Sequence, residues 1–322
     1  MRFVPAHLLS PGERARAVSV DGAADAAVQL GHWPGAATPE RFRADLGVEA
    51  ALRFAASERG ALEIATNDHH DADGVLSLLA VLRPDEARSD AERYVAAAAF
   101  SDFGQGHDED ALKLAATLDG LLRSPLSPLA AKLEGLPVPD AAALATEHAL
   151  AILPGLADDL EPHWALWSDE LERFQASRDA LASGALAVTD LPPARLTVAE
   201  WTREPHAAVV DRAAQGDLVL VAVEGERGYR YGAAWRGWAW APTTSRSRPR
   251  IATLSLEKFA LTLNSLEGQR AGRWVAEGLG RERTGALAFA AQDGTLLEST
   301  LRPDEVAEKL AWFLVERRAA TR

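Results

Sequence analysis

Residues 67–76, with the sequence N-D-H-H-D-A-D-G-V-L, contain the densest group of side chains that could do chemistry. Three carboxylates and two imidazoles fall within six consecutive positions. Aspartate oxygen and neutral imidazole nitrogen together suit Mn²⁺, Mg²⁺, Zn²⁺ or Fe²⁺. Asp, Asn and Gly are also frequent in turns and helix N-caps, which leaves turn chemistry as the alternative. Because capping requires neither two histidines nor the extra carboxylates, the pattern favours a metal or catalytic site.

The sequence around this cluster predicts a strand, a tight turn and a helix. An apolar run over 61–65 precedes the cluster, and a second apolar run over 75–82 follows Gly74. The cluster therefore falls at the carboxyl end of a strand, where open α/β sheets bind ligands. If the segment is extended, alternate residues point to one side. We then expect His69, Asp71 and Asp73 to point to one side of the segment, and Asp68 and His70 to point to the other.

Two earlier segments predict strands that could join the same sheet. Residues 17–20 lead into Asp21 and a glycine, and residues 28–30 lead into His32 and a Trp-Pro-Gly turn. If both strands run parallel to the one before the cluster, Asp21 and His32 share its sheet edge. For Asp21, a turn role before glycine is the interpretation that the sequence favours. His32 lies in an unusual turn, and we expect it to contact substrate.

The spacing His69-x-Asp71-x-Asp73-Gly74-x-x-Ser77 resembles the first motif of the DHH phosphoesterase superfamily. That superfamily includes single-strand exonucleases, oligoribonucleases, cyclic-dinucleotide phosphodiesterases and inorganic pyrophosphatases, in which paired Mn²⁺ ions activate water. The resemblance implies a metal-dependent hydrolase of a phosphoester or phosphoanhydride. It also implies Mn²⁺ or Mg²⁺ as cofactor and a small phosphorylated or nucleotide-like substrate.

The expected site combines this motif with a later aspartate. Asp102, in the segment F-S-D-F-G, is similar to the lone aspartate of the superfamily's second motif. The expected metal ligands are His69, Asp71, Asp73 and Asp102. The expected catalytic side chains are His70 and Asp68.

The sequence departs from the superfamily in one respect. A later, separate Asp-His-His triplet is missing, and the candidates His107 and His148 do not match it. This difference leaves open a remodelled or one-metal site, or a catalytically inactive binding or scaffold protein that retains the fold. A metal-dependent hydrolase of a non-phosphoester substrate is a third alternative. The chain also resembles a bacterial family known only as a domain of unknown function, on the evidence of residues 18–22, residues 30–35 and the motif. This resemblance gives no information about activity.

The amino-acid composition limits the kinds of molecule that the protein is expected to bind. The chain has 322 residues, 48% of them hydrophobic, a formal net charge of −13 and no cysteine. The acidic balance argues against binding to extended duplex nucleic acid, and the lack of cysteine excludes disulfides and thiolate ligands. No apolar stretch approaches the ~18 residues of a membrane span, and the N-terminus has no signal-peptide pattern. We therefore expect a cytoplasmic protein without membrane contact, and the sequence leaves a homo-oligomer open.

The length suggests two domains, with the best boundary at Leu191-Pro192-Pro193. We expect an α/β fold. Residues 1–192 should form a DHH-like domain with a largely parallel sheet, flanking helices and the metal site. Residues 193–322 should form a smaller mixed α/β domain that binds substrate. There the segment 243–250 carries three arginines among hydroxyl side chains; it could grip a phosphate or be a solvated loop. The expected substrate contacts are Arg246, Arg248, Arg250 and His32.

Overall fold

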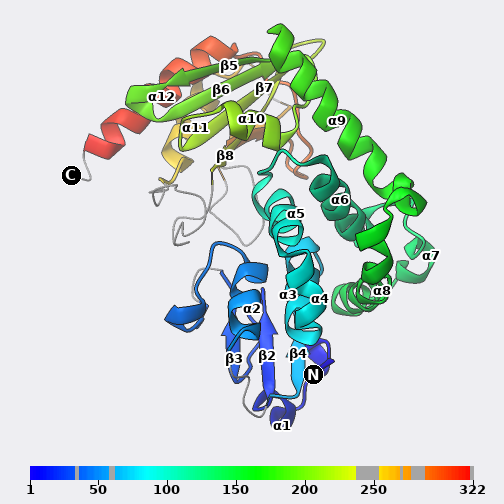
Figure 1. The fold of residues 1–322 in the computed structure, drawn as a ribbon. Coiled ribbons are helices and arrows are strands. Elements are labelled where there is room, and N and C mark those ends of the chain that lie inside the picture. The colour runs from blue at the N-terminus through cyan, green and yellow to red at the C-terminus, as the bar shows by residue number, and fades with distance from the viewer. Residues whose placement is uncertain (33–35, 58–61, 237–253, 269–270, 277–286, 320–322) are drawn as a thin grey trace. The chain divides into compact units, whose positions relative to one another are not determined.

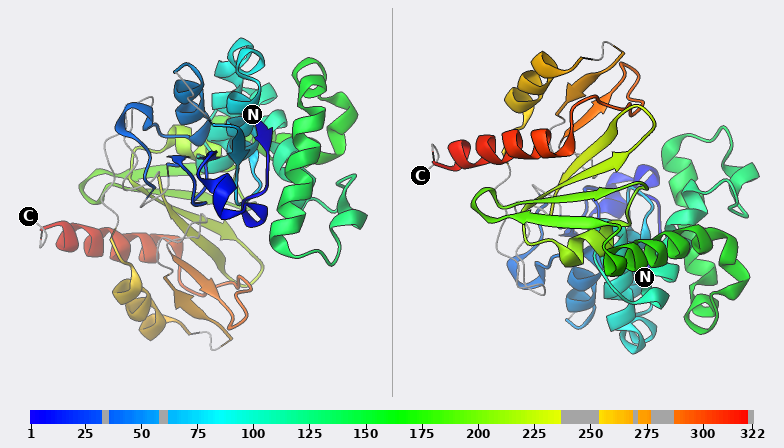
Figure 2. Two further views of the ribbon diagram at one scale, coloured as in Figure 1. Left: turned by 90° about the horizontal axis from the view of Figure 1, so that it is seen from below. Right: turned by 90° about the horizontal axis from the view of Figure 1, so that it is seen from above.

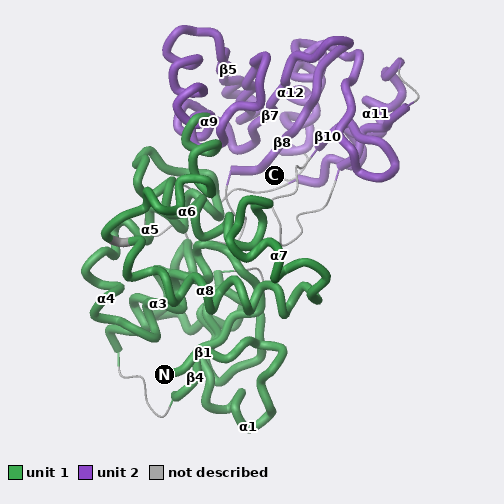
Figure 3. The backbone as a smooth tube through the Cα atoms, turned by 90° about the vertical axis from the view of Figure 1, so that its right-hand side faces the viewer, with its two compact units in different colours: residues 1–172, 240–250 green, residues 173–239, 251–322 purple. Residues whose placement is uncertain are grey.

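The computed structural model describes residues 1–32, 36–57, 62–236, 254–268, 271–276 and 287–319 (Figure 1). These residues divide into two units (Figure 3). The first unit is Met1–Glu172, and the described residues from Arg173 onward form the second. The expected boundary, Leu191-Pro192-Pro193, lies within the second unit between two paired strands. The roles expected for two domains stay a prediction.

The first unit is built on a four-stranded sheet in the order β1-β4-β2-β3. Its strands are β1 (Arg2–Phe3), β2 (Ala17–Val20), β3 (Val28–Leu30) and β4 (Ile64–Thr66). Every neighbouring pair is parallel, and Val18 of β2 lies opposite Val28 on one side and Ala65 on the other. β2 is buried along its whole length, as an apolar strand of a parallel sheet should be. The prediction of a parallel sheet with flanking helices is confirmed.

Helices make up most of the rest of this unit. They are α1 (Pro11–Arg14), α2 (Gly47–Ala55), α3 (Ala72–Leu82), α4 (Pro84–Ser89), α5 (Ala91–Phe103), α6 (Glu109–Arg123), α7 (Ala130–Leu133), α8 (Val138–Asp158) and α9 (Trp164–Ser183), with 3₁₀ turns η1 (Ala6–Leu8), η2 (Glu40–Phe42) and η3 (Glu161–His163). α9 continues into the second unit. α3 is apolar on nearly all sides, and ten of its eleven residues are buried, which fits a central helix. It packs against α2 and α5 (Figure 1).

Two further segments of this unit lie close to the polar cluster. The turn η2 and then α2 follow Thr38, whose hydroxyl donates to the Gly31 carbonyl. The helix α5 continues as far as Phe103. Asp102 therefore projects from the last turn of a helix.

The second unit has a six-stranded sheet in the order β5-β6-β7-β8-β10-β9. Its strands are β5 (Ala187–Leu191), β6 (Leu196–Trp201), β7 (Leu218–Glu224), β8 (Tyr229–Trp235), β9 (Arg273–Val275) and β10 (Leu287–Ala290), and its further elements are η4 (Pro192–Ala194), α10 (Ala207–Ala213), α11 (Glu257–Leu266) and α12 (Pro303–Ala319). β6 and β7 are parallel and the other neighbours are antiparallel. The predicted mixed α/β character is confirmed. α11 and α12 lie along the sheet (Figure 2), and their buried apolar side chains share one core with those of the strands.

Among the described helices, none combines the length and apolar character needed to cross a membrane.

Candidate metal centre

Three neighbouring strands of the first unit end at one edge of the sheet, and each is followed by a polar side chain. Asp21 follows β2, His32 lies two residues after β3, and the polar segment 67–71 follows β4. Because all three strands are parallel, their carboxyl ends meet. Asp21 has φ of +48°, a left-handed conformation that aspartate tolerates better than most residues. Its amide donates to the Leu30 carbonyl, which ties the ends of β2 and β3 together.

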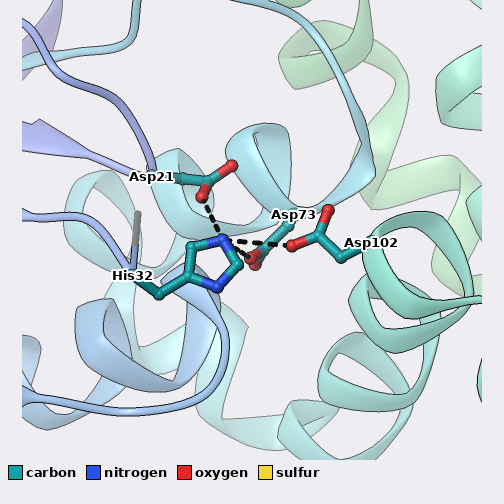
Figure 4. Close-up of side chains that lie close together, drawn as sticks. All are labelled: Asp21, His32, Asp73 and Asp102. Atoms are coloured by element: carbon teal, nitrogen blue, oxygen red, sulfur yellow. Dashed lines mark ion pairs between the residues drawn. The ribbon is translucent and has the colours of Figure 1, made fainter. Parts of the chain in front are cut away.

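Four side chains form a buried cluster, which we call the inner group: Asp21, His32, Asp73 and Asp102 (Figure 4). Nε2 of His32 lies 3.0 Å from Asp21 Oδ1, 3.2 Å from Asp102 Oδ2 and 3.7 Å from Asp73 Oδ2. The exposed fractions of these side chains are between 0 and 4%. One imidazole nitrogen and three carboxylates therefore converge on a small, dry space.

Backbone groups fix the inner group from outside. Nδ1 of His32 donates to the Asp45 carbonyl at 2.6 Å, so the neutral ring would present a lone pair on Nε2 to the carboxylates. The two carboxylate oxygens of Asp73 accept hydrogen bonds from the amides of Gly47 and Val48, at 2.6 and 2.7 Å. These amides begin α2, where the helix dipole favours a negative charge. Asp73 thus anchors α2 and faces His32 at the same time.

A second set of side chains, which we call the outer group, consists of Asp21, His69 and Asp71. Nε2 of His69 lies 3.2 Å from Asp21 Oδ2 and 3.0 Å from Asp71 Oδ2. Nδ1 of the same ring contacts Asp68 Oδ1 at 2.9 Å, and Oδ2 of Asp68 accepts from the Ala23 amide. The His69 side chain is 33% exposed. The outer group therefore lies nearer the surface than the inner group, although Nε2 of His69 and both Asp21 oxygens are themselves buried.

Asp21 belongs to both groups and presents a different oxygen to each. Oδ1 faces His32 and Oδ2 faces His69. A carboxylate in this arrangement can bridge two cations. The space around it is tight: a Cβ added at Gly47 would lie 2.6 Å from Asp21 Cβ, and one added at Gly22 would lie 2.7 Å from Asp68 Oδ1. Glycine at these two positions lets the neighbouring backbone approach the carboxylates closely.

The protonation of the inner group reflects crowded negative charge. Burial raises the pKa of Asp73 well above its usual value, and the neighbouring carboxylates of Asp21 and Asp102 raise it further. Burial also raises the pKa of Asp102. Burial alone would lower the pKa of His32, but hydrogen bonds to Asp102 and Asp21 raise it well above its ordinary value. These shifts all favour added positive charge among the carboxylates, which a divalent cation could supply in place of protons.

The outer group contains an ion pair. Burial would raise the pKa of Asp71, but the charge and hydrogen bond of His69 hold it well below its usual range. The pKa of His69 is correspondingly well above its usual value, because the Asp71 charge and bonds to Asp21 and Asp68 outweigh burial. The Asp71 carboxylate also accepts from the Gly74 amide at 2.8 Å and so caps α3.

The donor atoms of both groups fit a divalent metal ion. In each group the potential ligand atoms all lie within 4.8 Å of one another. Oxygen and imidazole donors without sulfur suit Mn²⁺, Mg²⁺, Zn²⁺ or Fe²⁺. Both imidazoles have one nitrogen held by an oxygen outside the group, the arrangement that orients a histidine ligand toward metal. This buried acidic and histidine centre could therefore hold a metal ion.

The structure brings the four predicted ligands close together, but it divides them between two groups instead of one. His69 and Asp71 lie in the outer group, whereas Asp73 and Asp102 lie in the inner group. The segment after β4 is a turn and then a helix, so the alternation of an extended strand does not apply. His32, expected as a substrate contact, lies in the inner group.

The two predicted catalytic residues have different surroundings. Asp68 contacts His69, as described above. The buried His70 ring points to α6 and α8: Nε2 donates to the Leu118 carbonyl, and Nδ1 contacts the Thr146 hydroxyl, both at 2.9 Å. Burial is the main cause of its lowered pKa. Both ring nitrogens therefore serve contacts within the fold.

Three predicted substrate contacts, Arg246, Arg248 and Arg250, lie outside the described residues.

One acidic residue near this centre was not predicted from the sequence. Asp119 on α6 accepts from the Ala72 amide at 2.8 Å and from the Ser101 hydroxyl at 2.9 Å. It thereby joins the start of α3 to α5. Burial, and then the charge of Asp71, raise the pKa of Asp119 to about 7. Its position inside an ordinary amphipathic helix gave no local signal of this role.

A family model describes the whole chain. The protein belongs to the Family of unknown function (DUF6687). The match covers residues 1–321, so the likeness to a family without an assigned activity extends over almost the whole sequence. No curated protein matches the chain. Among solved structures, a pGpG-specific phosphodiesterase, PggH from Vibrio cholerae, matches with 10% sequence identity, a TM-score of 0.35 and coverage of 78% of each chain. That likeness is too distant to carry a conclusion about this family member.

Proposed function

We propose that this protein is a metal-dependent hydrolase of a phosphoester or phosphoanhydride in a small phosphorylated substrate, with Mn²⁺ as the preferred ion and Mg²⁺ as the alternative. The observation that carries this proposal is the position of Asp21. Its two oxygens face two different imidazoles, at 3.0 and 3.2 Å. Two neighbouring ion positions that share a carboxylate are typical of enzymes that displace groups at phosphorus. The likeness of the segment 69–77 to the first DHH motif supports the same activity.

Each ion position has its own set of side chains in this proposal. The ligands of the inner position would be Asp21, His32, Asp73 and Asp102. The ligands of the outer position would be Asp21, His69 and Asp71. The inner side chains are almost fully buried, which favours a firmly held ion, whereas the partly exposed His69 ring would place the outer ion nearer to water and substrate. A divalent ion bound there supplies Lewis acidity and lowers the pKa of water at the outer position.

The protein's own residues would then prepare the site. Asp68 orients His69 through Nδ1, so that Nε2 faces the outer position. Asp71 holds its carboxylate in place by capping α3. His70 is not a reacting group in this proposal, because its nitrogens hold Leu118 and Thr146. It positions the turn that carries its neighbour His69.

Metal content is the first test. Protein expressed in manganese-supplemented medium should contain two ions per chain by elemental analysis. Asp102→Asn and His69→Gln should each lose one. Asp119→Asn is a matched control, because it is an acidic side chain next to the centre that belongs to neither group. It should keep both ions.

Activity is the second test. Metal-loaded wild type should hydrolyse a member of a panel that includes bis(p-nitrophenyl) phosphate, short oligonucleotides and pyrophosphate. His69→Gln should lower that rate at least a hundredfold. A well-folded wild type that takes up no divalent ion would refute the proposal and favour a protonated structural network in a binding or scaffold protein. Metal uptake without hydrolysis of any panel member, but with turnover of carboxylic esters or amides, would favour a non-phosphoester hydrolase.

A further inference from the structure

Three exposed arginines of the first unit lie close together without acidic partners, and we call them the arginine patch: Arg41, Arg43 and Arg53. Arg41 belongs to η2, Arg43 follows that turn directly, and Arg53 lies on α2. All three residues are exposed. None of them forms an ion pair with a carboxylate among the residues that the structure describes. Such a group of cations stands out in a chain with a formal net charge of −13.

Other arginines of the same unit show the more usual arrangement. Each of the following has a carboxylate oxygen within 4 Å: Arg2, Arg14, Arg16, Arg83, Arg88 and Arg93. The acidic side chains close to the patch in the sequence do not serve in this way. Oε2 of Glu49 accepts from the Leu46 amide at 3.3 Å, and the exposed Glu40 forms no ion pair with a described residue. The described part of the fold therefore leaves the positive charge of the patch uncompensated.

Non-acidic groups orient the three guanidiniums. The guanidinium carbon of Arg41 lies 4.6 Å from the centroid of the Phe42 ring, which is itself buried. Nε of Arg43 donates to the Thr38 carbonyl at 3.2 Å. Nη1 of Arg53 donates to the Arg43 carbonyl, which brings α2 and the segment after η2 together. Because a guanidinium carries five N–H donors, these contacts leave most of the donors of the patch for a ligand.

The backbone beneath the patch is held by the metal centre. Residues 44–48 are all buried. The Asp45 carbonyl accepts from the His32 ring, and the amide of Val48 is one of the two that donate to Asp73. The arginine patch therefore stands on a fixed segment of the chain. Such preorganisation lowers the entropic cost of binding a ligand.

The remaining guanidinium donors suit phosphate oxygens. Arginine presents two N–H groups in a planar fork that matches two oxygens of a phosphate, which a lysine does not. Neighbouring cations also repel one another, and a ligand with several negative charges offsets that repulsion. We propose that the arginine patch binds a ligand that carries two or more phosphate groups, as inorganic polyphosphates and short oligonucleotides do. This binding needs no metal ion, so the inference goes beyond the proposed hydrolase and is independent of it.

Full-length protein in EDTA tests the patch separately from the metal centre. Inorganic tripolyphosphate and a short oligothymidylate are the probes, and calorimetry measures their affinities. Arg43→Gln should weaken binding roughly fivefold, and Arg41→Gln/Arg43→Gln/Arg53→Gln roughly a hundredfold. Arg123→Gln is the matched control, because Arg123 is also an exposed arginine without an ion pair among the described residues but lies on α6. It should bind as wild type does.

The salt dependence separates a direct phosphate contact from a structural effect. For oligothymidylate, log K should fall linearly with log salt concentration, and the slope should become shallower by roughly 0.7 for each arginine removed. Arg43→Lys should recover the slope of wild type but only part of its affinity, because lysine keeps the charge and lacks the fork. Circular dichroism checks that each variant is folded, and the single variants carry the test if the triple variant is not.

The possible outcomes differ clearly. Loss of tripolyphosphate binding in the patch variants would identify a phosphate chain as the ligand, whereas loss of oligothymidylate binding alone would identify a nucleic-acid backbone; both support the inference. Equal affinities in wild type and the triple variant would overturn it, as would an equal loss in Arg123→Gln or no binding of either probe by wild type. Binding of hexaglutamate but of neither phosphate probe would favour an acidic protein partner and would also overturn it.

Discussion

Substitution of Asp21 by asparagine tests the two-ion centre most directly. Asp21 belongs to both the inner and the outer group. Asparagine has nearly the same shape and tolerates the left-handed backbone at φ +48°, so the variant should fold. Its amide lacks the negative charge and cannot bridge two cations through two oxygens. We expect Asp21→Asn to lose both ions, Asp102→Asn to lose the inner ion and His69→Gln to lose the outer ion.

The size of the effect follows from linkage between metal binding and folding. An ion at about a hundred times its dissociation constant stabilises the folded state by about 2.7 kcal/mol, and two ions by about 5 kcal/mol. Both groups lie in the first unit, Met1–Glu172. In a domain of about this size, each kcal/mol raises Tm by about 2–4 °C. The first unit of wild type should therefore melt roughly 10–20 °C higher in Mn²⁺ than in EDTA.

Thermal unfolding followed by circular dichroism, with and without EDTA, measures this shift. Asp102→Asn and His69→Gln should each show about half of it, and Asp21→Asn none. Asp119→Asn should show the full shift and serves as the control. A manganese-dependent shift in Asp21→Asn as large as that of wild type would refute the bridging role. If all three ligand variants lose the whole shift, the centre holds one ion.

Three further predictions concern the surroundings of the centre. Gly47→Ala should lower manganese affinity at least tenfold in calorimetry, because its Cβ would lie 2.6 Å from that of Asp21; Gly12→Ala, where nothing lies within 4 Å, is the control. In EDTA, wild-type stability should fall as pH rises toward and through about 7, because the fold favours the protonated form of Asp119, whose pKa is raised from 3.8 to about 7. Urea titrations between pH 4 and 8 should show that the free energy of unfolding of Asp119→Asn falls less steeply with pH than that of wild type. An unchanged pH dependence would contradict the assignment to Asp119. Asp73→Ala should destabilise the protein by about 2–4 kcal/mol even in EDTA, because two amides at the start of α2 lose their acceptor; equal stability would show that this anchoring is unimportant.

The class of fold and the location of the polar segment could be predicted because both depend on patterns of residues that are close together in the sequence. Short apolar runs bounded by turns specify buried strands, and the β2, β3 and β4 segments each contain one. The cluster that follows β4 was visible as an unusual concentration of carboxylates and imidazoles. The geometry of this cluster could not be predicted, because the turn after Thr66 and the start of α3 interrupt the alternation of side chains that an extended strand would have.

The tertiary structure decided which residues share the centre. Asp21 had the local appearance of a turn residue, and only the strand order β4-β2-β3 brings its carboxylate between His32 and His69. Asp102 approaches from the last turn of α5, which is remote in sequence from the strands that carry the other groups.

The sequence by itself thus determined the α/β class, the parallel sheet and most of the chemical groups at its edge. Only the tertiary structure decided their division into an inner and an outer group, the backbone amides that hold Asp73, and the contact that joins Arg53 to the Arg43 carbonyl. The physical reason is the distance along the sequence over which each effect acts. Hydrophobic periodicity and turn chemistry act over a few neighbouring residues, whereas ligand geometry depends on contacts between segments that are tens of residues apart and have no shared local pattern.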